Sequence, residues 1–198
     1  MTSTVPFFIT DLGDSAVTGT IAILFAAYLF IVGEKRMAAA MLLAFAGTGT
    51  LIALGKIILY NRCTATPLIL DLRSPSGHSA VSLAVYGTIA AIVSSAVPPR
   101  WRAAPYIIAV PFVTMIAVSR VLIHVHTRAD IAVGAIIGLT VSYGVWHFLI
   151  RGRHADIKWK TSALLLPAAL VALHGLRFPA EKYISHIATY LQNLLSLC

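Results

Sequence analysis

The sequence predicts an all-α membrane protein, a six-span transmembrane helix bundle formed by a single domain over residues 1–198. Only 11% of the residues are charged and 59% are hydrophobic, whereas a soluble domain carries about 25% charged residues. The mean hydropathy is +0.87. The apolar residues also form runs of about 17–25 residues, the length that a membrane-spanning helix requires. These runs are too long, and alternate too little, for the strands of a membrane barrel.

The elements follow in order along the chain. Residues 1–15 carry two aspartates and no Lys or Arg, so they lack the positive start of a cleavable signal peptide, and we expect a short surface element there. The apolar runs then place six spans at residues 16–33, 37–60, 79–97, 105–123, 130–150 and 160–176. The sixth run is the shortest. Residues 180–198 are expected to form a tail or an interfacial helix.

The distribution of Lys and Arg predicts the orientation. Six spans place both termini on one side of the membrane. Eight cationic residues lie on the opposite side or at its edge and seven on the side of the termini. Most of those seven lie beside the polar clusters described next. When these residues are left out of the count, Lys and Arg are in excess on the opposite side, which predicts that the opposite side is cytoplasmic. We therefore expect a bacterial inner-membrane protein whose termini face the periplasm or cell exterior. The net charge of +8 is typical of such loops and of contacts with anionic lipid, and does not indicate nucleic acid.

One polar cluster, RSPSGHSA at residues 73–80, precedes the third expected span on the side of the termini. Its proline and glycine favour a turn, and Ser76 and Ser79 can cap the helix that follows. A turn that leads into a helix presents backbone N–H groups and the positive end of the helix dipole, which together bind anions. His78 lies at the mouth of this predicted anion site.

A second cluster, SRVLIHVHTRAD at residues 119–130, lies on the same side. If the chain is helical there, Asp130 shares a face with His126 and accepts a hydrogen bond from one ring nitrogen. The other nitrogen can then act as a nucleophile. Arg120 offers a planar fork for phosphate oxygens, and His78 can donate a proton to a leaving oxygen. These groups together predict phosphoryl transfer through a phosphohistidine.

The two clusters resemble the signatures of a known family. PSGH at residues 75–78 and SRx5Hx3D at residues 119–130 fit the second and third motifs of the type 2 phosphatidic acid phosphatase (PAP2) superfamily, including their spacing. The first motif of that family is a lysine followed seven residues later by Arg-Pro. The sequence departs from it, because Cys63 stands seven residues after Lys56. The resemblance covers roughly residues 55–145.

The resemblance implies a role for each motif residue. His126 is the nucleophile, Asp130 is its partner, and His78 protonates the leaving group. The groups that hold the phosphate are Lys56, Ser76, Gly77, Ser119 and Arg120, with Gly77 acting through its backbone N–H. Either Arg62 or Arg73 replaces the missing first-motif arginine, and we favour Arg73, which lies on the loop expected to fold over the phosphate. No metal and no cofactor are expected, since cationic side chains and a helix N-terminus can neutralise the phosphoryl oxygens.

Several other patterns have simpler interpretations. His124 and His126 could form a metal pair, but only one acidic residue, Asp130, and no cysteine joins them, so zinc is disfavoured. Gly134-x3-Gly138 in the fifth run is typical of close helix packing. Cys63 and Cys198 fall on the same predicted side, which leaves a disulfide open. Four further histidines are interpreted as structural: His147, His154, His174 and His186.

The sequence thus predicts a lipid phosphatase that hydrolyses a phosphate monoester or pyrophosphate at the non-cytoplasmic membrane face. A lipid is favoured because the site lies at headgroup depth and the polar loops are short. Phospholipid, polyprenyl and glycolipid phosphates all stay open as substrates. One alternative is a lipid phosphotransferase that uses the same phosphohistidine. The other is a non-enzymatic lipid transporter, which is disfavoured because it requires ionisable residues in the middle of spans.

Overall fold

The computed structural model describes residues 4–59, 72 and 74–194, and in this part of the chain all regular structure is helical. Two short elements, a 3-10 turn η1 (Pro99–Trp101) and a π-helical turn η2 (Trp146–Ile150), accompany the α-helices. The α-helices are α1 (Thr4–Asp11), α2 (Ser15–Ile31), α3 (Lys35–Leu59), α4 (Gly77–Ala96), α5 (Ala104–Leu122), α6 (Arg128–Val145), α7 (Trp159–Leu173) and α8 (Ala180–Leu194). The predicted all-α class is confirmed, and each of the six apolar runs forms a helix.

The count of six spans is not confirmed. Among the described residues, four helical segments are long and apolar enough to cross a membrane: Lys35–Ile58, Gly77–Ala96, Pro99–Leu122 and Arg128–Ile150. A fifth is reached if α1 and α2, which meet at a bend of 41°, form one broken span. Helix α7 has only 15 residues, about 22 Å at 1.5 Å per residue, and so falls short of a hydrocarbon core of about 30 Å.

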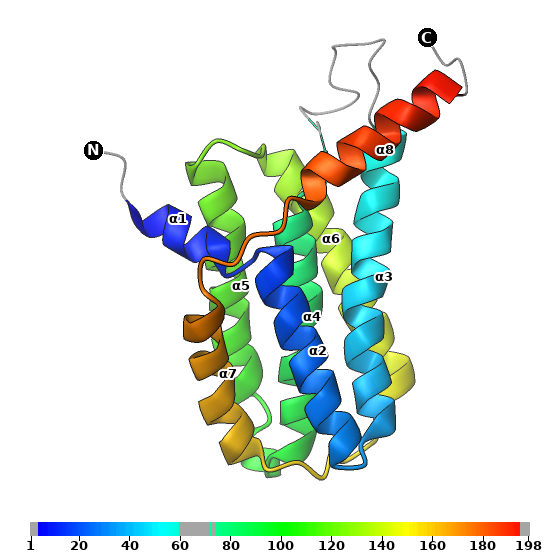
Figure 1. Cartoon of the computed structure of the whole chain (residues 1–198). Helices are drawn as coiled ribbons and strands as arrows, with labels where there is room; N and C mark the ends of the chain where they lie inside the picture. Colours follow the sequence, from blue (N-terminus) through cyan, green and yellow to red (C-terminus); the bar gives the residue numbers. More distant parts are fainter. Residues whose placement is uncertain (1–3, 60–71, 73, 195–198) are drawn as a thin grey trace.

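Helix α4 is the centre of the bundle (Figure 1). Inside the protein, 72% of its most apolar window is buried, against 39% or less for the other three long spans. Its sequence explains this position, because small Ala, Ser and Gly residues alternate with Val and Ile and let neighbouring helices approach. The remaining long helices run alongside it, while α1 and α8 lie across one end of the bundle (Figure 1).

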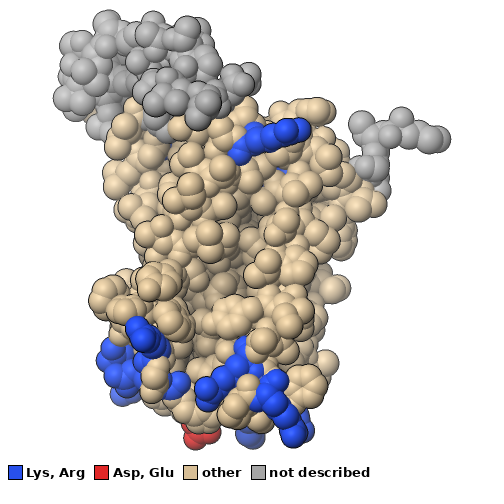
Figure 2. Space-filling view, turned by 180° about the vertical axis from the view of Figure 1, so that it is seen from behind, with Lys and Arg blue, Asp and Glu red and all other residues tan. Residues whose placement is uncertain are grey.

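The two ends of the bundle differ in charge. Both described ends of the chain, the start of α4 and the start of α6 lie at one end (Figure 1), as the predicted topology requires. Figure 2 shows Lys and Arg gathered at the other end. The exposed cations there are Lys35, Arg36, Arg100, Arg102, Arg151, Arg153, Lys158 and Lys160. The orientation of the bundle in the membrane stays a prediction.

The contact between α4 and α6 depends on two glycines. A Cβ on Gly134 would lie 2.5 Å from the carbonyl oxygen of Ser76 and 3.3 Å from its nitrogen. A Cβ on Gly138 would run into the carbonyl oxygen of Ala80. The two helices therefore meet backbone to backbone, which confirms that Gly134-x3-Gly138 is a packing motif. This contact sets the start of α4 directly against the first turns of α6.

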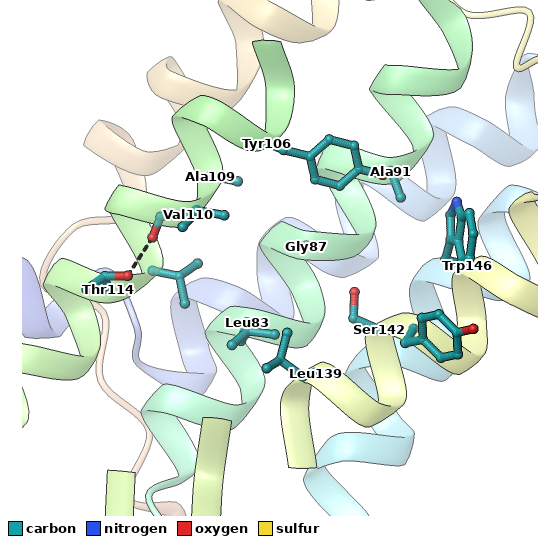
Figure 3. Close-up of a pocket in the computed structure, with 12 residues that line it drawn as sticks. Leu83, Gly87, Ala91, Tyr106, Ala109, Val110, Thr114, Leu139, Ser142 and Trp146 are labelled. Carbon is teal, nitrogen blue, oxygen red and sulfur yellow. Dashed lines mark hydrogen bonds between the residues drawn. The ribbon is translucent and has the colours of Figure 1, made fainter. Parts of the chain in front are cut away.

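An apolar groove lies beside this contact, over α4 and between α5 and α6 (Figure 3). Its volume is about 420 Å³. The groove exists because α4 offers small side chains there, at Gly87 and Ala91, while larger residues of the flanking helices form the walls. Tyr106 of α5 and Trp146 at the end of α6 line it toward the cationic end.

We expect Gly134→Ala to lower the free energy of unfolding by about 1–3 kcal/mol, because the added methyl group must displace backbone atoms of Ser76. Thermal unfolding of the purified protein in detergent measures the change. Gly144→Ala in the same helix is the matched control, since nothing lies within 4 Å of a Cβ there, and it should be neutral or slightly stabilising. Equal melting temperatures for the two variants would contradict the packing role.

Candidate functional site

The first motif-bearing element is the start of α4. Ser76 is the N-cap, and its hydroxyl oxygen accepts hydrogen bonds from the backbone N–H of Ser79 at 3.4 Å and from the Ser79 hydroxyl at 3.0 Å. The side chain of Ser76 is fully buried. The predicted cap is therefore confirmed for Ser76, whereas Ser79 supports it as a donor. The cap orients the N-terminal end of α4, with Gly77 and His78 in its first turn.

The second motif-bearing element is the turn between α5 and α6. His124 has a positive φ of 59°, and its N–H donates to the carbonyl of Val121 at 2.9 Å. The carbonyl of Arg120 accepts from Val125 at 3.3 Å and from His126 at 3.4 Å. This pattern is a Schellman-type helix end, in which the left-handed residue reverses the chain direction. It brings His126 back beside the end of α5.

Asp130 connects these two elements while being almost completely buried, at 1% exposure. Its Oδ1 accepts a hydrogen bond from the backbone N–H of Ser74 at 2.9 Å. Its Oδ2 accepts from the backbone N–H of Thr127 at 3.0 Å and lies 3.3 Å from Nδ1 of His126. Its carbonyl oxygen accepts from the N–H of Ser76 at 3.0 Å. One residue thus joins the entry to α4, the start of α6 and the histidine.

The predicted pairing of His126 with Asp130 is confirmed, but its cause differs from the expected one. Helix α6 begins at Arg128, and Thr127 is its N-cap, so His126 precedes the helix. The carboxylate turns back to the cap residue in a reciprocal capping box, in which the Thr127 hydroxyl accepts from the N–H of Asp130 at 3.1 Å. The contact with the imidazole follows from this backward turn and not from a shared helical face.

The expected cations of the site lie at the same end of the bundle. Lys56 is in the last turn of α3 and is only 9% exposed. Arg120 is in the last turn of α5, and its Nη1 donates to the hydroxyl of Thr10 at 3.1 Å. Lys56, Arg120 and His126 all act electrostatically on His78. Ser119 is buried and donates its hydroxyl to the carbonyl of Ile116 at 2.7 Å, so its oxygen can still accept.

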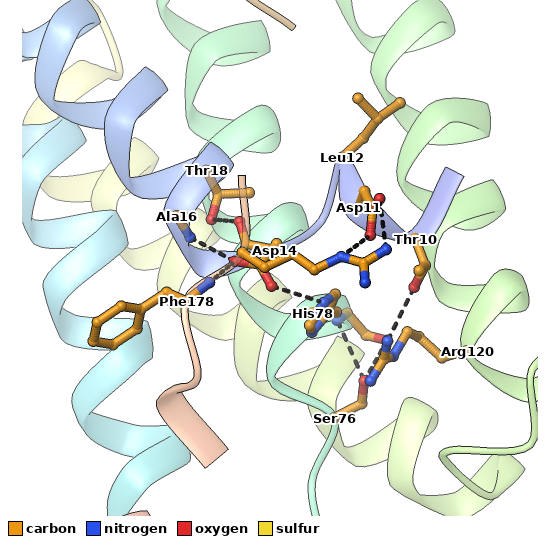
Figure 4. A network of polar contacts seen from close by, with 12 residues as sticks. Thr10, Asp11, Leu12, Asp14, Ala16, Thr18, Ser76, His78, Arg120 and Phe178 are labelled. Atoms are coloured by element: carbon orange, nitrogen blue, oxygen red, sulfur yellow. Dashed lines mark hydrogen bonds and ion pairs between the residues drawn. The ribbon is translucent and has the colours of Figure 1, made fainter. Parts of the chain in front are cut away.

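The N-terminal segment also enters this cluster (Figure 4). Asp14, the N-cap of α2, places Oδ2 at 3.7 Å from Nε2 of His78. Asp11 at the end of α1 accepts two hydrogen bonds of 3.0 Å from the guanidinium of Arg177. The bidentate pair raises the pKa of Arg177 above its ordinary value. Helix α1 and the link between α7 and α8 are thereby joined over the site.

This result corrects the expectation that residues 1–15 form a surface element. Thr10, Asp11 and Asp14 are at most 7% exposed, because each of these polar groups has a partner inside the cluster. Only the N-terminal part of α1 is exposed, where Val5, Phe7 and Phe8 are at least 47% accessible. The sequence did contain a sign that this segment is part of the polar cluster. Asp11 and Asp14, two of the seven acidic residues of the chain, lie immediately before an apolar run.

Other candidate residues are exposed or lie outside the described residues. The side chains of His124 and Arg128 are exposed. Within the described residues, no three His, Cys, Asp or Glu side chains are grouped so that they could hold a metal ion. Arg62, Arg73 and both cysteines lie outside the described residues, so the preference for Arg73 over Arg62 stays a prediction and the disulfide stays open.

The comparisons with known proteins bear on this cluster. Residues 58–153 match the family model described as the PAP2 superfamily. This part of the chain belongs to the PAP2 superfamily. The match includes the motif residues of α4 and of the turn between α5 and α6, and it begins two positions after Lys56. Membership supports phosphatase activity in general and confirms the family expected from the sequence.

A relative extends the likeness beyond the motifs. An uncharacterized 22.5 kDa protein in the cps region of Klebsiella pneumoniae is 28% identical over 188 residues, which cover 89% of this chain and 87% of that protein. No solved structure gave a significant match to the chain. The similarity to the Klebsiella protein therefore includes the flanking helices that carry no PAP2 motif.

Asp130→Ala should destabilise the protein, because the partly buried N–H groups of Ser74 and Thr127 would lose their acceptor, at about 1–3 kcal/mol for each group. Thermal unfolding in detergent again measures this. Asp156→Ala is the control, since Asp156 is exposed. The backbone N–H of Asp156 donates to Glu34 at 2.7 Å, and alanine keeps this donor. A melting temperature of Asp130→Ala equal to that of the control would rule out the linking role.

Proposed function

We propose that this protein is a membrane lipid phosphatase that works through a phosphohistidine on His126. The observation that carries the proposal is the buried pair of His126 and Asp130. The carboxylate faces Nδ1 at 3.3 Å, so it favours the tautomer with the proton on Nδ1 and leaves Nε2 with the lone pair that a nucleophile needs.

The proposed reaction has two steps. In the first, Nε2 of His126 attacks phosphorus, the bond between phosphorus and the leaving oxygen breaks, and His78 gives a proton to that oxygen. In the second, water attacks the phosphohistidine and gives a proton to His78, while the P–N bond breaks and phosphate is released. Asp130 holds the imidazole throughout and stabilises the positive charge that the ring carries as a phosphohistidine.

The charge of the phosphoryl group is balanced by the surroundings of the two histidines. Lys56 and Arg120 supply cationic groups from α3 and α5, and the capped start of α4 supplies backbone N–H groups and the positive end of a helix dipole. This set supports the proposal that no metal ion is needed for turnover, which stays a prediction. Arg62 or Arg73 is proposed to add a further cation.

A lipid is proposed as the substrate because the apolar groove begins close to these groups. Leu83, which lines the groove, is five residues after His78 on α4, a distance of about 8 Å along the helix. A phosphate held at His126 therefore leaves an attached hydrocarbon chain near the entrance between α5 and α6. The position of the charges supports an active site facing the periplasm, since the exposed Lys and Arg at the opposite end favour the cytoplasm.

His126→Ala should lower the rate of phosphate release by about a thousandfold or more, because it removes the covalent step. His78→Ala should lower the rate by about 10²–10⁴-fold, because it removes the general acid. Inorganic phosphate released from phosphatidic acid in detergent is the measurement. Both variants should unfold at the temperature of the wild type to within a few degrees. Activity of His126→Ala within about tenfold of the wild type would refute the assignment.

The groove gives a second test, directed at the substrate class. Ala109→Phe places a ring in the space proposed for the hydrocarbon chain. We expect kcat/KM for dioleoyl phosphatidic acid to drop about tenfold, equivalent to roughly 1.4 kcal/mol, while p-nitrophenyl phosphate is hydrolysed as before. Ile107→Phe on the same helix is the control, because Ile107 is 69% exposed and does not line the groove. Equal effects on both substrates would contradict the role of the groove.

A further inference from the structure

Asp14 lies opposite His78, and the proposed mechanism above does not use it. Its Oδ2 is 3.7 Å from Nε2 of His78, a separation that fits a charge pair or a bridging water rather than a direct hydrogen bond. Asp14 is 7% exposed. A buried carboxylate beside an imidazole favours the protonated form of the ring.

The position of Asp14 is determined by backbone contacts. Its Oδ1 accepts hydrogen bonds from the N–H of Ala16 at 2.8 Å and from the N–H of Phe178 at 3.0 Å. Its carbonyl oxygen accepts from the hydroxyl and the N–H of Thr18, both at 2.9 Å. These contacts hold one carboxylate oxygen and leave the other directed at the imidazole (Figure 4).

The residue before Asp14 permits this close approach. A Cβ on Gly13 would run into Cγ2 of Ile116, would lie 2.9 Å from the hydroxyl of Ser82, and would lie 3.5 Å from Cδ2 of His78. The turn between α1 and α2 therefore packs on α4 and α5 only because residue 13 has no side chain. The carboxylate reaches the histidine as a result of this packing.

The other charged groups that act on His78 would all disfavour a protonated ring. These groups are Arg120 of α5, Lys56 of α3 and His126 of the connecting turn. The two nearby carboxylates have other partners, since Asp11 pairs with Arg177 and Asp130 with His126. Asp14 is thus the carboxylate placed to offset the effect of these cationic groups on His78.

We propose that Asp14 is a positioning residue that orients His78 as the general acid and favours the protonated form of its ring. The inference rests on the proposed phosphatase function. With Nε2–H facing Asp14, the proton that moves is the one on Nδ1. It passes to the leaving oxygen as the P–O bond breaks, and Nδ1 then takes a proton from the attacking water. The active site therefore contains two Asp–His pairs, one for the nucleophile and one for the acid.

The leaving group provides the test. A p-nitrophenolate ion departs without protonation, whereas an alkoxide needs a proton from a general acid. Asp14→Asn removes the charge but keeps a good N-cap. We expect kcat for n-octyl phosphate to drop at least tenfold more than kcat for p-nitrophenyl phosphate, with KM for both substrates little changed. Asp14→Glu should restore most of the activity on the alkyl substrate.

Asp11→Asn is the matched control, because Asp11 is equally buried in the same segment but pairs with Arg177. It should leave the ratio of the two kcat values unchanged. Equal losses on both substrates in Asp14→Asn would overturn the inference while leaving the phosphatase proposal intact. A wild-type protein that hydrolyses neither substrate nor phosphatidic acid would refute the proposed function itself. If Asp14→Asn does not fold, Asp14→Ser also keeps the cap and should give the same shift in the ratio.

Discussion

The structure of the site depends on the buried carboxylate of Asp130. A carboxylate at 1% exposure is stable inside a protein only when it has several donors, and Asp130 has them in the N–H groups of Ser74 and Thr127. Each donor belongs to a different segment. The same interaction that makes burial tolerable therefore also determines where the entry to α4 and the start of α6 lie. The histidine is held by a group that the backbone has already placed.

This arrangement requires that α4 and α6 touch closely. Gly134 lies against the backbone of Ser76, and Gly138 against that of Ala80, so the hydrogen bond from Ser76 to the carbonyl of Asp130 can form at 3.0 Å. In an apolar environment such close approach is stabilised by van der Waals contact and small residues rather than by hydrophobic burial. Helix packing and site geometry are thus two consequences of the same pair of glycines.

The polar residues at this end are partnered by segments distant in sequence. Arg120 near the middle of the chain meets Thr10, and Asp11 meets Arg177. The N-terminal segment also brings two carboxylates to this end, Asp11 beside Arg177 and Asp14 beside His78. The groove over α4, between α5 and α6, lies farther along α4 from His78 and is apolar (Figure 3). Charge at the end and apolar surface along the span match the two parts of a phosphorylated lipid, which is the basis of the proposed substrate class.

The sequence by itself determined the helical class, the bounds of the helices, the family and the grouping of motif residues at one end. Long apolar runs and motif spacing are local properties, and they predicted α3 to α6 to within a few residues. The apolar runs did not determine the number of spans, because the 15-residue length of α7 and the bend between α1 and α2 depend on how these helices pack.

Only the tertiary structure decided which groups support the motif residues. Asp14 precedes His78, and Thr10 precedes Arg120, by more than sixty residues of sequence, and no local pattern links the members of either pair. Their place follows from the packing of the α1–α2 turn on α4 and α5. The pairing of His126 with Asp130 was predicted from a helical spacing that the chain does not have there. It forms because a capping box, made possible by Thr127, directs the carboxylate backward, and such a contact depends on where the helix begins in three dimensions.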